Sequence, residues 1–101
     1  MYGLPDGAVE KINKVFEKYS AIEKAVLYGS RAKGTYKNGS DIDLTLFGHV
    51  TFQELLRIET ELDDLLLPWM IDLSIYKHID NPALIDHIGR VGLVFFGKRE
   101  I

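Results

Sequence analysis

Two aspartates separated by one residue, Asp41 and Asp43, could do chemistry together. They begin the stretch 41–47, where apolar and polar residues alternate strictly, and this period of two predicts a half-buried strand. Carboxylates at positions i and i+2 of a strand leave the same face and repel each other unless a cation lies between them. Hard oxygen ligands suit Mg²⁺ or Mn²⁺, which share their coordination shell with substrate phosphates. Asp72, on the polar face of a second alternating stretch at 70–76, would complete a two-metal site if the two strands are neighbours.

A turn precedes the aspartates. Gly29-Ser30 follows the strand-like stretch 22–28, and glycine allows the backbone to come close to a ligand. Ser30 offers a hydroxyl and a backbone N–H to an anion, and a short helical turn beginning there would add further N–H groups. The turn opens the most basic stretch of the chain, with Arg31, Lys33 and Lys37. Together, the turn and the carboxylates predict a site for a nucleoside triphosphate and its metal.

Each of these features also has a simpler interpretation. A pair of aspartates on a strand is often a solvated face, and a sheet with polar-faced strands can simply be open to water on one side. A Gly-Ser pair after a strand is a common turn, and basic loop residues are usually solvated. The joint arrangement of turn and carboxylates favours the functional interpretation.

The surrounding sequence predicts the elements that hold these residues. Apolar residues at helical spacing predict helices over 5–19, 51–67 and 81–90, the second opened by the capping box Thr51/Glu54. Strands are expected at 22–28, 41–47, 70–76 and 93–96, followed by a charged tail at 98–100. The order α-β-β-α-β-α-β predicts an α/β (α+β) fold, with a mixed sheet of about four strands and helices mainly on one face.

Length and composition exclude several classes of function. A chain of 101 residues has room for one domain and none for a separate substrate domain. The net charge of −3 argues against general nucleic-acid binding, which takes a basic face. The absence of cysteine excludes a thiolate metal site and a cysteine nucleophile. No apolar run is long enough for a membrane span, and residues 1–7 do not resemble a signal peptide, so we expect a cytoplasmic protein without membrane contact.

The composite pattern of Gly29-Ser30, ten intervening residues and Asp41-x-Asp43 resembles the signature of the polymerase-β-type nucleotidyltransferase superfamily. Its extended form, over 29–34 and 40–44, is similar to the minimal nucleotidyltransferases found with HEPN proteins in prokaryotic two-gene pairs. The similarity spans essentially the whole chain, so residues 1–101 are expected to form one nucleotidyltransferase domain. The similarity does not include the additional substrate domain that larger members of the superfamily carry.

The resemblance implies a role for each matching residue. Gly29 and Ser30 would hold the triphosphate, and Arg31 would help to balance phosphate charge. Two Mg²⁺ ions, or Mn²⁺, would be coordinated by three carboxylates: Asp41, Asp43 and Asp72. The third of these would also help to deprotonate the attacking hydroxyl.

The expected reaction is transfer of a nucleoside monophosphate, AMP from ATP, to a hydroxyl acceptor with release of pyrophosphate. By analogy with the two-gene pairs, the acceptor would be a tyrosine of a HEPN toxin, which the modification would silence. The alternative is a non-catalytic antitoxin or nucleotide-binding module that acts by complex formation. A template-free polymerase acting on RNA ends is disfavoured by the net negative charge. So small a domain is also compatible with a homodimer or a hetero-oligomer.

The histidines have no metal-ligand spacing. They are far apart in sequence, and we expect loop or helix-surface positions for all three: His49, His78 and His87.

Overall fold

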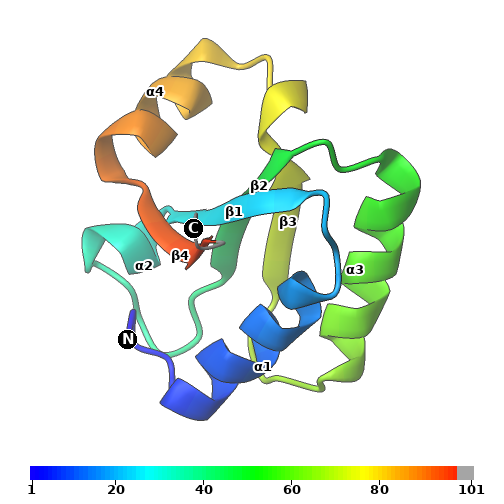
Figure 1. Ribbon diagram of the computed structural model, residues 1–101. Helices are drawn as coiled ribbons and strands as arrows, with labels where there is room; N and C mark the ends of the chain where they lie inside the picture. The colour runs from blue at the N-terminus through cyan, green and yellow to red at the C-terminus, as the bar shows by residue number, and fades with distance from the viewer. Residues whose placement is uncertain (98–101) are drawn as a thin grey trace.

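The computed structural model describes residues 1–97, and the predicted tail at 98–100 lies outside them. The helices are α1 (Asp6–Glu17), α2 (Ser30–Lys33), α3 (Phe52–Asp64) and α4 (Pro82–Val91), with a 3₁₀ turn η1 (Tyr76–His78). The strands are β1 (Ile22–Tyr28), β2 (Ile42–Gly48), β3 (Ile71–Ile75) and β4 (Leu93–Gly97) (Figure 1). The predicted order of elements is confirmed, and the short helical turn expected at Ser30 is α2.

One four-stranded sheet, in the order β3-β2-β1-β4, organises the described residues. β1 pairs antiparallel with both β2 and β4, whereas β2 and β3 run parallel. The sheet is therefore mixed, as predicted. The parallel β2–β3 pair needs a crossover connection, which α3 supplies.

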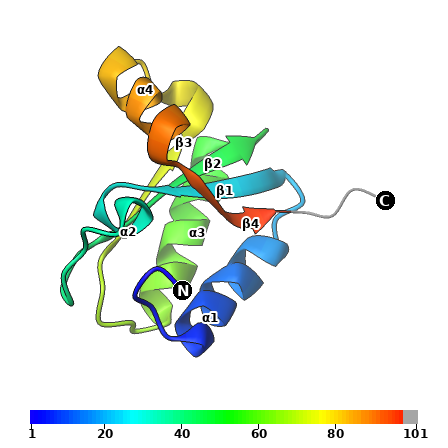
Figure 2. The ribbon, with the colours of Figure 1, turned by 90° about the vertical axis from the view of Figure 1, so that its left-hand side faces the viewer.

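The two faces of the sheet are covered differently. α1 and α3 pack side by side on one face, where their apolar residues meet alternate strand residues such as Leu27 and Leu44. α4 lies on the opposite face, where Ile88 packs against Val26 and Tyr28 of β1 (Figure 2). The prediction of helices mainly on one face is confirmed, and α4 leaves part of the second face uncovered.

Local capping explains where two of the helices begin. The Thr51 hydroxyl accepts a hydrogen bond from the Glu54 N–H, and the Glu54 carboxylate accepts one from the Thr51 N–H, each at 3.1 Å. This is the predicted capping box of α3. At the start of α4, the Asn81 side chain accepts hydrogen bonds from the Ala83 and Leu84 N–H groups. Within residues 1–97, no helix has the length and apolar character needed to cross a bilayer.

Candidate active site

Two carboxylates meet on the partly uncovered face of the sheet. In the parallel ladder Asp43 of β2 stands directly opposite Asp72 of β3, and in the antiparallel ladder it stands opposite Tyr28 of β1. Residues paired in this way point to the same face. Tyr28 packs against α4, so the row Tyr28-Asp43-Asp72 lies on the α4 face. The two strands that carry these aspartates are therefore neighbours, as the predicted site requires.

The electrostatics around Asp43 fit a cation. Partial burial raises the pKa of the Asp43 carboxyl, and the negative charges of Asp72 and Asp41 raise it further, with His87 acting in the opposite direction. A carboxylate that is penalised by burial and by like charges gains when a positive ion joins it. The oxygen-only donor set suits a hard divalent ion such as Mg²⁺.

The three-carboxylate cluster predicted from the sequence is not assembled. Among residues 1–97, no three carboxylate or imidazole groups lie close enough together to surround a metal ion. Asp41 is exposed and precedes β2, which begins at Ile42 with a hydrogen bond from its N–H to the Met70 carbonyl. Because Asp41 lies outside the ladder, pairing with β3 does not fix its side chain as it fixes that of Asp43.

Gly29 brings the turn after β1 against the Asp43 carboxylate. Its φ of 75° and ψ of −156° belong to a region that residues with a side chain rarely adopt. A Cβ at this position would lie 2.3 Å from Asp43 Oδ2, so the carboxylate or the turn would have to shift to accommodate a side chain. Ser30 follows as the first residue of α2. The turn and the carboxylates, predicted to act jointly, are thus adjacent in the fold.

Arg31 points inward, which differs from the predicted contact with phosphate. The residue is 2% exposed, and its Nε and Nη2 donate to the Ser40 carbonyl at 3.1 and 2.8 Å. Its Nη1 donates to the Tyr2 carbonyl at 3.0 Å. The guanidinium also lies 5.4 Å from the centre of the Tyr36 ring and 5.8 Å from that of Trp69. In this arrangement Arg31 holds the loop that leads to the first aspartate.

Replacing Arg31 by Met should therefore destabilise the fold. The change removes three hydrogen bonds from a charged donor and leaves two partly buried carbonyls without them, so we expect a loss of about 2–4 kcal/mol in the free energy of unfolding. Urea denaturation would measure it. Lys33→Met, at an exposed position two residues along, is the matched control and should change stability by less than about 0.5 kcal/mol. Equal stabilities of the two variants would contradict the positioning role.

Sequence reasoning missed His87 as a neighbour of this site. Its Nε2 accepts a hydrogen bond from the Gly29 N–H at 3.1 Å, and its ring meets Tyr28 edge-on with centroids 6.2 Å apart. Of the three histidines, this one was expected on a helix surface. No local spacing could have found it, because 58 residues separate it from Gly29 and only the packing of α4 on β1 brings them together.

Adjacent acidic strands with a glycine turn at the carboxylates are the arrangement expected of a nucleotidyltransferase. The family model "Polymerase beta, Nucleotidyltransferase" matches residues 10–101, which is nearly all of the sequence. The chain therefore belongs to the polymerase beta nucleotidyltransferase family, and the predicted superfamily is confirmed.

Solved structures share the fold of this chain. A toxin–antitoxin complex with AMP-PNP contains a chain with a TM-score of 0.71 and 20% identity, covering 90% of this chain and 74% of that one. The tri-AMPylated Shewanella oneidensis HEPN toxin in complex with MNT antitoxin gives a TM-score of 0.67 and 17% identity, covering 97% and 74%. At these identities the likeness establishes the fold alone.

The curated relative comes from Methanocaldococcus jannaschii and is named a "putative protein adenylyltransferase". It is 39% identical over 54 residues, which are 52% of this chain and 54% of that protein. The chain thus spans about half the length of the curated relative it matches.

Proposed function

We propose that this protein is a metal-dependent nucleotidyltransferase that moves AMP from ATP to a hydroxyl group of a protein and releases pyrophosphate. One observation carries the proposal: Asp43 and Asp72 stand opposite each other on parallel strands, with the Gly29 turn against the first of them. Paired carboxylates beside a turn that can approach phosphate are what metal-dependent nucleotidyl transfer needs.

The reaction forms one bond and breaks one. The acceptor oxygen bonds to the α-phosphorus of ATP, the bond from that phosphorus to the bridging oxygen breaks, and pyrophosphate leaves with the bonding electrons. Mg²⁺, when bound, neutralises phosphate charge and makes the acceptor hydroxyl more acidic. In this chain Asp43 and Asp72 would hold it, with Asp41 as the third ligand, and a carboxylate oxygen of Asp72 would take the acceptor's proton. Ser30 would donate hydrogen bonds to the triphosphate, and Gly29 would allow it to come close.

The acceptor class rests on the relatives. One is named as a protein adenylyltransferase, and one structural neighbour is an MNT antitoxin in complex with an AMPylated HEPN toxin. We therefore propose a tyrosine of a HEPN partner as the acceptor, so that AMP transfer silences a toxin.

The decisive experiment combines the purified protein, a HEPN protein encoded beside it, ATP and Mg²⁺. A mass increase of one AMP on the partner supports the proposal, and omission of Mg²⁺ should abolish it. A tight complex whose partner keeps its original mass would instead support a non-catalytic antitoxin.

Removing the Ser30 hydroxyl should weaken nucleotide binding. Loss of one hydrogen bond to a charged phosphate costs roughly 1.5–3 kcal/mol, which raises the Kd for Mg·ATP by about ten- to a hundredfold. Titration calorimetry of Ser30→Ala would measure this change. Thr60→Ala removes a hydroxyl that bonds the Leu56 carbonyl on α3, the helix on the other face, and should leave the Kd unchanged. If Ser30→Ala binds Mg·ATP like the wild type, the triphosphate does not contact this hydroxyl.

A further inference from the structure

Gly29 is held from two sides. On one side it lies against the Asp43 carboxylate, so closely that a Cβ built on it would lie 2.3 Å from Asp43 Oδ2. On the other side its N–H donates to His87 Nε2 at 3.1 Å. The histidine bond fixes the plane of the Tyr28–Gly29 peptide, which sets the direction in which the turn leaves β1. The histidine bond therefore adds to the β1–β2 pairing of Tyr28 with Asp43 in setting the position of the turn beside the carboxylate.

The imidazole is itself held in place. Its ring meets Tyr28 edge-on, and the next residue, Ile88, is buried against Val26 and Tyr28 of β1. These contacts fix both the orientation of the ring and the distance of α4 from the sheet.

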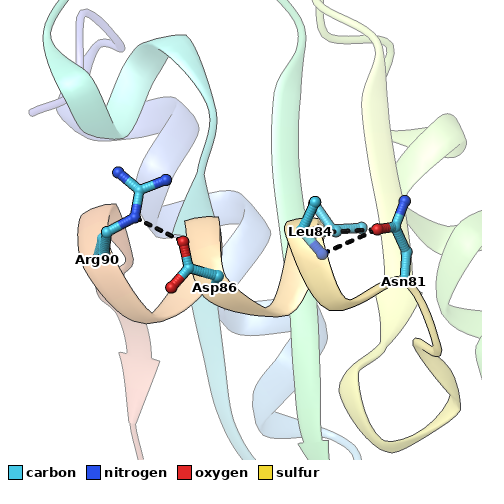
Figure 3. A network of polar contacts seen from close by, with 5 residues as sticks. Asn81, Leu84, Asp86 and Arg90 are labelled. Atoms are coloured by element: carbon cyan, nitrogen blue, oxygen red, sulfur yellow. Dashed lines mark hydrogen bonds and ion pairs between the residues drawn. The ribbon is translucent and has the colours of Figure 1, made fainter.

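Contacts within α4 add to this support. Figure 3 shows the helix in front of the strands, with the Asn81 side chain at its first turn and Asp86 beside Arg90. The Arg90 Nε donates to Asp86 Oδ2 at 2.8 Å. The Gly92 N–H closes the last turn on the Ile88 carbonyl. Capping at both ends keeps the turn that carries His87 helical.

We propose that His87 is a positioning residue for nucleotidyl transfer. Its Nε2 accepts the hydrogen bond of the Gly29 amide, and this keeps the Gly29-Ser30 turn against Asp43 so that triphosphate and carboxylate are aligned. His87 acts through Gly29 and does not touch the reacting atoms. That the turn binds a triphosphate rests on the proposed function. That His87 holds the turn rests on the hydrogen bond alone.

Two substitutions distinguish the effect of the hydrogen-bond acceptor from the effect of the size of the ring. His87→Gln keeps an acceptor, the side-chain carbonyl oxygen, and His87→Phe keeps an aromatic ring beside Tyr28 without one. His49→Phe is the matched control, because His49 is exposed on the chain that follows β2. Where His87→Phe fails to fold, His87→Met removes the acceptor with a flexible side chain.

The first measurement is hydrogen exchange of the Gly29 amide by NMR, which does not depend on enzymatic activity. In His87→Phe this amide should exchange about tenfold faster or more, because its hydrogen bond is lost, while His87→Gln should exchange within about threefold of the wild type. The second measurement is AMP transfer. His87→Phe should lose about tenfold in kcat/KM for ATP, shared between a lower kcat and a higher KM, and His87→Gln should recover most of it.

Three results would overturn the inference: unchanged Gly29 exchange in His87→Phe, equal losses of transfer in the Gln and Phe variants, or tighter ATP binding in His87→Phe. The last would show that the imidazole competes with phosphate for the amide. A failure of the proposed function looks different, because the partner would then gain no AMP even with the wild-type protein, while the exchange result still held. A purely structural role would lower the melting temperature of the Gln and Phe variants together, without the rescue by Gln.

Discussion

Asp43→Asn is expected to reduce AMP transfer about a thousandfold or more while the protein stays folded. The substitution keeps the size and shape of the side chain and removes the negative charge that would bind the metal opposite Asp72. Initial rates with ATP, Mg²⁺ and the partner protein would measure the loss. Transfer within about tenfold of the wild-type rate would contradict the assignment of Asp43 as a metal ligand.

The thermal stability of Asp43→Asn should show whether the loss of AMP transfer is caused by unfolding. Burial and two like charges raise the pKa of the Asp43 carboxyl above its value in the unfolded chain. Its ionised form is therefore penalised in the folded state, and the penalty appears as the pH rises through the folded pKa and persists at neutral pH. Asn carries no charge, so the melting temperature of Asp43→Asn at pH 7 should equal or exceed that of the wild type. Asp63→Asn, the same change at an exposed position on α3, should alter neither rate nor stability.

Gly29→Ala is expected to have the second largest effect, a loss of about a hundredfold in transfer. Its Cβ would lie 2.3 Å from Asp43 Oδ2, so either the carboxylate or the turn has to move by an ångström or more. A misplacement of this size at a reacting centre costs about two orders of magnitude in rate. The positive φ of Gly29 adds strain, and we expect the free energy of unfolding to fall by about 1–3 kcal/mol.

Gly34→Ala is the matched control for this variant. Gly34 also has a positive φ, 81°, but nothing lies within 4 Å of a Cβ built there. Backbone strain should lower the free energy of unfolding of Gly34→Ala by about 1 kcal/mol, but without a steric clash. The variant should keep its transfer rate within about threefold of the wild type. If Gly34→Ala lost as much activity as Gly29→Ala, strain in the loop rather than the approach to Asp43 would explain both.

The secondary structure could be predicted from local signals. Strict alternation marked β2 and β3, and the Thr51/Glu54 pair marked the start of α3. These patterns alone could not predict that Asp43 pairs with Asp72. Alternation tells which residues share a face of one strand, but strand order and register decide which residues meet across strands. For that reason the sequence predicted the joint site only if the two acidic strands were neighbours. The parallel β2–β3 pair meets this condition.

The features of the site that sequence reasoning did not reach depend on tertiary packing. Asp41 appeared to continue the alternation of β2, yet the ladder begins one residue later. Arg31 stands in a basic loop, and only the fold brings the carbonyls of Ser40 and Tyr2 to it. His87 lies in a helix without a motif, and its partner Gly29 is on a strand end 58 residues away. None of these contacts leaves a signal in residue type or spacing.

We propose above that Asp43 and Asp72 together hold a divalent metal ion beside the Gly29 turn. The most direct test is a crystal structure of the protein with Mn²⁺ and a non-hydrolysable ATP analogue, in which anomalous scattering locates the metal. We predict a manganese peak about 2.0–2.3 Å from a carboxylate oxygen of each of these two aspartates, with the triphosphate against the turn. A manganese peak that contacts neither carboxylate, with the nucleotide bound elsewhere, would contradict the account.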